Sequence, residues 1–373
     1  MKKIFILILL IILNFFNCAN AIEEIKLEKQ NINLDYLSDV YYGKIEKEDE
    51  VPALLRLFSE QGLKFKNSKI NSFRISMLYD SSLTYTNPDS GSSSLTHKFP
   101  SIEPRFIMRF NENKTEATVY FHLTRDIPDH KNGFTEKLSR AYISHTINKN
   151  QRILFGEGHA IPTNYNGSRS TMQREFVLKS QFGRTIGDVY AIGIRNYGTY
   201  KYLDYDIGIY DGARFMEDIG CGTDFTGFFM FKPFEDIKEK VGSFKVGTGH
   251  NFGKYKTSYH QHSIYTSYDY KKLHLKAEYA MADGYNNAIN SKNNVDGFYT
   301  SISYDILPKF TLSARYDYFN ANKHIIDSDS REYTLGLTYK PYKNMKLLLN
   351  FIRRNIKNGS DSNMILFATR IFI

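Results

Sequence analysis

Residues 310–318 read FTLSARYDY and residues 331–340 read REYTLGLTYK, and both segments alternate strictly between apolar and polar side chains. In the second segment, one side collects the apolar and aromatic residues Tyr333, Leu335, Leu337 and Tyr339, and the other collects Glu332, Thr334, Gly336, Thr338 and Lys340. A period of two is typical of a β-strand with one apolar and one wet face. The two segments therefore predict an all-β fold.

The chain stops on a further strand of this kind, at Ile371-Phe372-Ile373. An exposed apolar edge strand is a liability in a soluble sheet, because an open edge pairs with other chains. A closed barrel in a membrane has no open edge. We therefore expect a transmembrane antiparallel β-barrel in which the last strand pairs with the first, near Phe73.

Strand-like segments recur from Ser72 onward, and their connections alternate between long and short. The count is about sixteen, an even number as single-chain bacterial barrels have, and wide enough for an aqueous channel. Counting back from Ile373 predicts short turns on the periplasmic side and long loops outside. The expected strands lie near 73–85, 102–110, 137–147, 152–158, 188–197, 201–211, 222–232, 240–250, 258–270, 271–281, 295–306, 309–319, 331–340, 343–354 and 362–373, with the third strand, which carries Ala117 to Leu123, between the turn at 111–114 and the loop at 126–136.

The chain divides into three parts, the last of which is the barrel. Residues 1–21 read as a secretory signal peptide, with Lys2 and Lys3, an apolar run from Ile4 to Phe16, and the small-residue site Ala19-Asn20-Ala21. Residues 22–70 are charged and lack alternation, so we expect a periplasmic N-terminal arm or, alternatively, an unstructured lead-in. Residues 71–373 are the predicted barrel. Cleavage after residue 21 leaves Cys221 alone, which excludes an intramolecular disulfide.

The composition agrees with a barrel of the bacterial outer membrane. Mean hydropathy is −0.43, and no apolar stretch after the signal reaches the ~20 residues of a transmembrane helix. Barrels give weak hydropathy signals because only alternate residues meet lipid. Removing the two signal lysines leaves 47 basic residues against 40 acidic ones, since the whole chain has 49 and 40. The resulting +7 favours anions only mildly, and we expect no nucleic-acid partner.

Several motifs resemble those of the phosphate-selective porin family. They are Asp296-Gly297-Phe298-Tyr299, the run from Tyr304 to Pro308, the run from Ala314 to Phe319, and the strand Tyr333 to Tyr339. Arg152 to Gly156 and Asp206 to Gly212 look like earlier strands of that family. The resemblance covers roughly residues 100–373 and implies a sixteen-stranded, trimeric outer-membrane porin with a basic constriction. Two features depart from the family: the last residue is Ile373 rather than an aromatic, and loop 159–187 lacks a dense basic ladder.

The candidate pore-lining or constriction residues are basic. Two of them, Arg169 and Arg174, lie in the long loop 159–187, which would narrow the pore if it folds inward. The others lie on the strand faces opposite the lipid-facing side: Arg105, Arg109, Arg195, Lys276 and Arg315. Acidic residues share these faces, so two roles remain open for the charges. They either create an electric field that selects ions in a water-filled lumen, or they form ion pairs that stiffen the wall, as Arg315 and Asp317 would.

Other chemistry has weaker support in the sequence. His260 and His262 share one strand face and His250 is nearby, but no carboxylate or cysteine completes a metal set, so we expect wall histidines and no metal or cofactor. His122, His145 and His274 have no motif that supplies a nucleophile. We therefore expect a porin rather than an enzyme, passing small hydrophilic solutes, with a preference for anions, phosphate among them. An outer-membrane hydrolase and a surface adhesin remain the alternatives.

Overall fold

The computed structural model describes residues 62–65, 69–124, 135–160, 171–186, 190–211, 223–254, 258–284 and 294–373. The predicted signal peptide, most of the predicted N-terminal arm and Arg169 lie outside these residues. Among the described residues, no helix has the length and hydrophobicity needed to cross a membrane.

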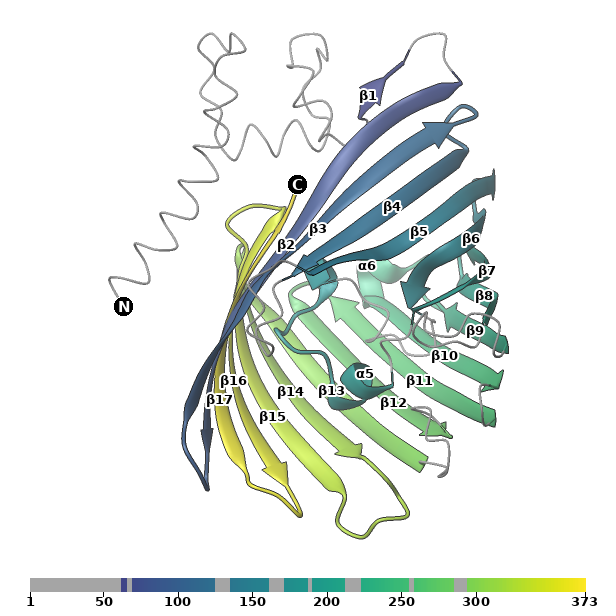
Figure 1. Ribbon diagram of the computed structural model, residues 1–373. Coiled ribbons are helices and arrows are strands. Elements are labelled where there is room, and N and C mark those ends of the chain that lie inside the picture. Colours follow the sequence, from purple (N-terminus) through teal and green to yellow (C-terminus); the bar gives the residue numbers. More distant parts are fainter. Residues whose placement is uncertain are drawn as a thin grey trace, which may run out of the picture.

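Sixteen antiparallel strands form a closed barrel, as the sequence predicts (Figure 1). Consecutive strands are neighbours throughout, and the circle closes where β17 pairs with β2. A further two-residue strand, β1 (Leu63–Lys64), pairs with the start of β2. The barrel strands are β2 (Ile70–Pro88), β3 (Ser94–Phe110), β4 (Thr115–Thr124), β5 (Thr135–Asn148), β6 (Gln151–Ala160), β7 (Tyr190–Thr199), β8 (Leu203–Asp211), β9 (Thr223–Phe231), β10 (Ser243–Lys254), β11 (Ser258–Tyr270), β12 (Leu273–Asp283), β13 (Asn294–Leu307), β14 (Phe310–Asn320), β15 (Asp329–Tyr339), β16 (Met345–Ile356) and β17 (Ser362–Phe372).

The alternation in sequence becomes an alternation in exposure. In β15, Leu335 is 58% exposed on the outer face, whereas its neighbour Thr334 is 2% exposed on the inner face. The same holds in β14, where Leu312 lies outside and Thr311 lies inside. In these two strands, the polar positions therefore point into the barrel and the apolar ones point to its surroundings, as lipid requires.

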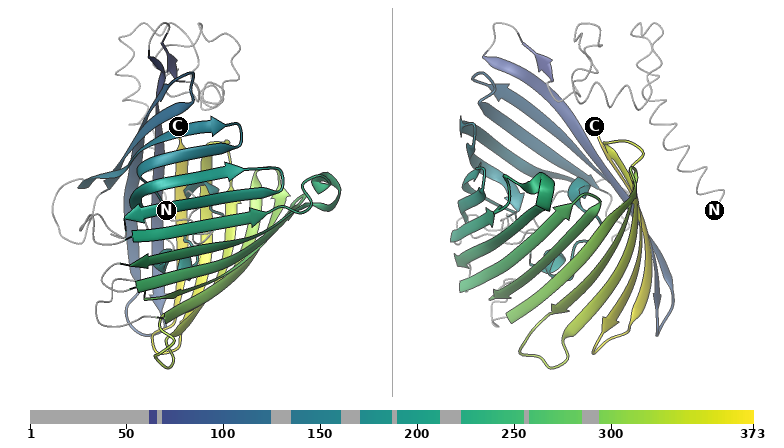
Figure 2. Two further views of the ribbon diagram at one scale, coloured as in Figure 1. Left: turned by 90° about the vertical axis from the view of Figure 1, so that its right-hand side faces the viewer. Right: turned by 180° about the vertical axis from the view of Figure 1, so that it is seen from behind.

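Most connections at one end of the barrel are short turns, and most at the other end are longer (Figure 2). The exceptions are the β9–β10 connection, 232–242, at the first end and the β10–β11 connection, 255–257, at the second. The β3–β4 turn has left-handed backbone at Asn111, Glu112 and Asn113, a conformation that Asn tolerates better than most residues. One boundary differs from the sequence prediction: β10 begins at Ser243, because Lys238–Val241 form the helical turn α6. Gly242, at φ 89°, ends this turn, where a Cβ would lie 2.9 Å from the Asp269 carbonyl oxygen.

The first long connection is shorter than the sequence suggests, because β2 extends to Pro88 and β3 begins at Ser94. This connection contacts the one between β16 and β17. Arg353 donates to both carboxylate oxygens of Asp89, at 2.8 and 2.7 Å, and also to Asp361. The Arg353 guanidinium holds the pKa of Asp89 below its usual range. These contacts link the two connections that flank the β17–β2 pair.

Candidate channel and constriction

Residues 171–186 lie inside the barrel, and we call them the inward segment. They contain a short 3-10 helix, η2 (Thr171–Gln173), and the helix α5 (Gln181–Thr185). Figure 1 shows α5 within the ring of strands rather than at its rim. Part of the predicted loop 159–187 therefore folds inward, and Arg174 comes with it.

Backbone groups of the inward segment are satisfied by side chains from the barrel wall. The Val177 amide donates to Asn350 Oδ1 at 2.7 Å, and the Gln181 amide donates to Asp317 Oδ2 at 2.9 Å. Ser180 begins α5, where its Oγ accepts from the Gly183 amide at 3.2 Å. A buried non-strand segment needs such partners, because an unpaired backbone group away from water is costly.

Two buried arginines of the wall donate to carbonyl oxygens of the inward segment. Arg315 donates to the Leu178 and Lys179 carbonyls at 3.0 and 3.3 Å. Arg370 donates to the Phe176 and Val177 carbonyls at 3.3 and 2.9 Å. The side chains of Arg315 and Arg370 are only 2% and 1% exposed. They therefore hold the segment against β12–β17 rather than lining open space.

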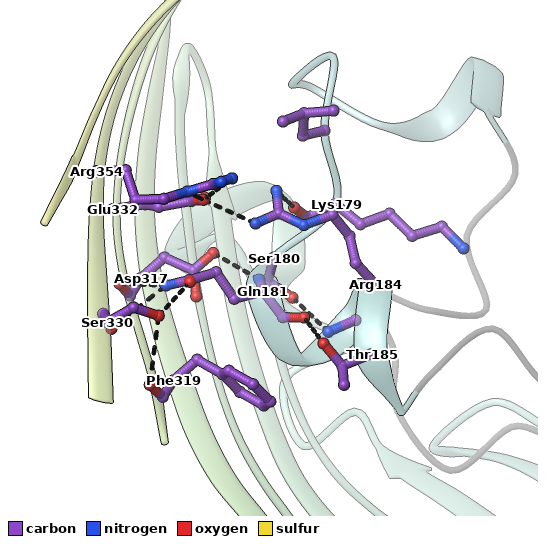
Figure 3. A network of polar contacts seen from close by, with 12 residues as sticks. Lys179, Ser180, Gln181, Arg184, Thr185, Asp317, Phe319, Ser330, Glu332 and Arg354 are labelled. Carbon is purple, nitrogen blue, oxygen red and sulfur yellow. Dashed lines mark hydrogen bonds and ion pairs between the residues drawn. The ribbon is translucent and has the colours of Figure 1, made fainter. Parts of the chain in front are cut away.

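A carboxylate and two arginines add a charged contact between the inward segment and the wall (Figure 3). Glu332, fully buried in β15, accepts from Arg184 at 2.8 Å and from Arg354 at 2.6 Å through the same oxygen. Figure 3 shows Lys179 extending away from these strands. The contact joins α5 to both β15 and β16.

Apolar contacts and two strand glycines complete the fit. Phe182 and Ile186 pack with Ala280, Val295 and Tyr299, and Val177 packs with a second buried cluster that includes Leu348 and Ile352. A Cβ on Gly336 would lie 3.3 Å from the Phe176 ring, and a Cβ on Gly297 would lie 3.3 Å from Phe182 Cβ. The missing side chains therefore leave room for aromatic rings of the inward segment.

The predicted basic residues fall into two groups by their surroundings. Arg315 and Lys276 lie under the inward segment: Arg315 has its ring contact with Phe176 at 4.8 Å, and Lys276 pairs with Glu175. A space of about 20 Å³ between the segment and β12–β14 includes both residues in its lining. Arg315, a candidate for the pore lining or the constriction, donates its guanidinium hydrogen bonds to carbonyl oxygens of the inward segment, and its side chain is 2% exposed.

Arg105, Arg109 and Arg195 lie on the part of the wall that the inward segment leaves uncovered. Their side chains are 16%, 24% and 14% exposed. Each has a carboxylate partner: Glu103 at 3.3 Å, Glu116 at 3.1 Å, and Asp206 for Arg195. Each of these three arginines therefore forms an ion pair within the wall, which is the second of the two roles expected from the sequence.

Sequence reasoning missed a further basic group on this wall. Ser76, Arg105, Tyr120 and Arg140 are successive cross-strand partners over β2–β5, so they share the inner face. The guanidinium carbons of Arg105 and Arg140 lie 4.6 and 5.4 Å from the centre of the Tyr120 ring. Arg140 lies in the strand expected near 137–147 and in β5, but the sequence analysis did not assign its face.

His122 has a hydroxyl group within hydrogen-bond distance. Ser101 Oγ lies 2.5 Å from His122 Nε2, which gives His122 a partner that no motif had indicated. Asp80, the cross-strand neighbour of Ser101, accepts from Arg370 at 3.1 Å. No described carboxylate therefore orients His122 as a catalytic triad requires. Within the same residues, no group of three or more His, Cys, Asp or Glu side chains is placed to hold a metal ion.

Comparison with known proteins agrees with the barrel architecture. A family model described as Gram-negative porin matches residues 237–358, about a third of the chain, and no curated protein matches in sequence. The anion-selective porin of Comamonas acidovorans superimposes with a TM-score of 0.61 at 14% identity, covering 81% of this chain and 99% of that one.

Two other solved structures give the same result. OprB of Pseudomonas putida has a TM-score of 0.63 at 10% identity, with coverage of 81% and 94%. The outer-membrane channel DcaP of Acinetobacter baumannii has a TM-score of 0.56 at 12% identity, with coverage of 84% and 99%. The chain is therefore an outer-membrane β-barrel with the fold of the porins, and its residues 237–358 match the Gram-negative porin family.

Proposed function

We propose that this barrel is a porin: a water-filled channel through which small hydrophilic solutes diffuse passively, without covalent chemistry. The observation that carries the proposal is the inward segment. It is fixed against β12–β17 by buried hydrogen bonds and ion pairs, so it narrows the interior without covering the wall of β3–β9. A partly filled barrel with charged inner walls selects solutes by width and by electric field.

We further propose a preference for anions, phosphate among them. On the inner face of β2–β5, the described side chains include four arginines, at 74, 105, 109 and 140, and three carboxylates, at 80, 103 and 116. Asp80 is also held by Arg370, which leaves this wall positive. The anion-selective porin of Comamonas acidovorans has the same fold, and Arg174 adds a positive charge from the inward segment.

A homotrimer is the assembly that we propose. It follows from the resemblance to trimeric porins in the sequence motifs. OmpT of Vibrio cholerae, which has a solved structure described as a trimer form, superimposes with a TM-score of 0.54 at 11% identity. Cross-linking in native membranes, followed by electrophoresis, would test this.

Single-channel recording in a planar bilayer tests the channel itself. Purified, folded protein should insert and give discrete conductance steps, and a complete absence of steps from folded protein would contradict the porin proposal. Reversal potentials in a potassium chloride gradient, and then in a potassium phosphate gradient, measure the preference for anions.

Charge reversal on the uncovered wall tests where the preference arises. Arg105→Glu combined with Arg140→Glu should move the reversal potential toward cation selectivity, since it replaces two positive charges on the inner wall with two negative ones. Arg331→Glu is the matched control, because Arg331 lies at the outer surface and its side chain is 51% exposed. Arg169→Glu with Arg174→Glu tests the contribution of the long loop in the same way. An unchanged reversal potential in the wall variant would exclude these arginines as the selective group.

A further inference from the structure

Three histidines lie together on the outer face of the barrel, where lipid-facing residues belong. In β10 the outward positions include Val246 and Phe252, which are 37% and 52% exposed, and His250 lies between them with the same parity. In β11 the outward Ile264 is 61% exposed, and His260 and His262 share its parity. His250 and His262 are cross-strand partners, with their Nδ1 atoms 2.7 Å apart, and the rings of His260 and His262 are 5.4 Å apart.

The depth of this histidine cluster matches lipid headgroups rather than acyl chains. His260 and His262 are the third and fifth residues of β11, at the barrel end that carries the long connections. At about 3.3 Å per residue and with tilted strands, the cluster lies within roughly 10 Å of the strand ends. Ionisable side chains on a lipid-facing surface are costly and rare, so a group of three calls for a polar partner.

The charges around the cluster favour an anionic partner when the histidines are protonated. Lys254, the outward residue of β10 after Phe252, is exposed. Asp283 of β12 lies 3.9 Å from His260 Nε2. The facing outward residues of β9 are Phe225, Gly227 and Phe229, which carry no charge. One of the two Nδ1 atoms of His250 and His262 must accept from the other at 2.7 Å, so two of the three histidines can carry a positive charge together. Two imidazolium charges and one lysine outweigh the carboxylate of Asp283.

A concavity opens on the same outer face, further along the strands from the histidine cluster. Its volume is about 600 Å³, and its lining is mainly apolar. Small outward residues of four neighbouring strands form its floor: Thr266, Ala277, Thr300 and Ala314. Tyr268, Tyr316 and Tyr333 stand beside them. We call this feature the outer groove.

The spacing between the two features suits one lipid molecule. Thr266 is four residues from His262 on β11, which is about 13 Å along the strand. That distance is shorter than an extended fatty acyl chain. We propose that the histidine cluster and the outer groove form one binding site for an anionic phospholipid, with its phosphate on the histidines and an acyl chain in the groove.

Native mass spectrometry of the folded, detergent-solubilised protein tests this proposal with phosphatidic acid and with diacylglycerol of the same chains. Phosphatidic acid should be retained better at pH 5.5 than at pH 8, because an imidazolium attracts phosphate whereas a neutral imidazole does not. The expected gain is on the order of fivefold for each charge that contacts the phosphate. Diacylglycerol should show no such pH dependence.

Two sets of variants separate the two halves of the site. His250→Gln, His260→Gln and His262→Gln together should remove the pH dependence, whereas His324→Gln, an exposed residue of the β14–β15 connection, should leave it unchanged. Ala277→Leu with Ala314→Leu should fill the groove and weaken both lipids. Gel mobility of unboiled samples shows whether each variant has folded.

Three outcomes would overturn the site. Equal retention of phosphatidic acid at both pH values in the native protein would remove the role of the histidines. Unchanged retention in the filled-groove variant would remove the role of the groove. Loss of an oligomer in that variant, with lipid retention unchanged, would assign the groove to a second copy of the chain. None of these depends on whether the barrel conducts ions.

Discussion

Glu332 holds α5 against two strands of the barrel wall. It is fully buried, and one of its oxygens accepts from both Arg184 of the inward segment and Arg354 of β16. Arg315 and Asp317 lie on the inner face of the neighbouring strand, 3.6 Å apart. Removing one partner from such a buried network leaves uncompensated charge, which costs more than the network contributes.

Glu332→Ala should therefore release the inward segment and destabilise the barrel. We expect a loss of about 3–5 kcal/mol, the range for breaking a buried ion pair, together with a larger and noisier single-channel conductance. Thermal unfolding followed by circular dichroism, and bilayer recordings, measure the two effects. Arg331→Ala is the neighbouring control, because its exposed pair with Asp329 should contribute at most ~1 kcal/mol. Equal effects of the two substitutions would contradict this role of Glu332.

For single side chains, the sequence predicted which face of the sheet each one occupies, but not which residues it contacts. Parity placed Arg315 and Asp317 on one inner face, and His260 and His262 together, as the structure has them. It could not show that Arg315 is covered, because its partners are backbone carbonyls that are 136 and 137 residues distant in sequence. It also could not join His250 to His262, since their contact depends on the register between β10 and β11.

The inward segment is the element that turns a barrel into a constricted barrel. It has no period-two or helical pattern, so the sequence indicated only a long loop that would lie either inside or outside. Two glycines of the strands nevertheless mark where the inward segment packs. Gly297 and Gly336 interrupt inner faces that otherwise carry larger side chains, and rings of the inward segment occupy the space beside them.

Gly336→Val should displace the inward segment without changing any charge. A Cβ at this position would lie 2.7 Å from Asn350 Nδ2 and 3.3 Å from the Phe176 ring, and Asn350 holds the Val177 amide. Overpacking of this kind costs about 1–3 kcal/mol, so single-channel conductance should rise and thermal stability should fall. Gly227→Val is the control, since a Cβ there meets only Phe229 at 3.4 Å. Unchanged conductance in Gly336→Val would show that the segment does not limit the channel.

For the whole molecule, the sequence predicted most directly that the barrel closes by pairing of its last strand with its first. Sixteen alternating segments, an even count and an apolar last strand predicted the β17–β2 pair, and the structure contains it from Ser362↔Pro88 to Phe372↔Leu78. The side chains at the end of β17 were less predictable. Phe372 shares the inner parity of Arg370, and its ring lies 5.0 Å from the guanidinium carbon of Arg105, so this aromatic contacts the inner wall rather than lipid.

Arg370 should stabilise the closed barrel more than any exposed contact across the same pair of strands. It joins β17 to β2 through Asp80 at 3.1 Å, and its other two nitrogens hold the inward segment. Arg370→Ala would leave Asp80 and two carbonyl oxygens without this donor, so we expect a loss of about 3–5 kcal/mol. Arg370→Lys should recover only part of it, because an ammonium cannot span three acceptors as a guanidinium does. Arg353→Ala provides the comparison: it also removes contacts across this pair, but in an exposed site, where about 0–1 kcal/mol is expected. Heat-dependent gel mobility of the folded protein in lipid vesicles ranks the three variants, and an Arg353→Ala effect as large as that of Arg370→Ala would show that closure does not depend on the buried contact.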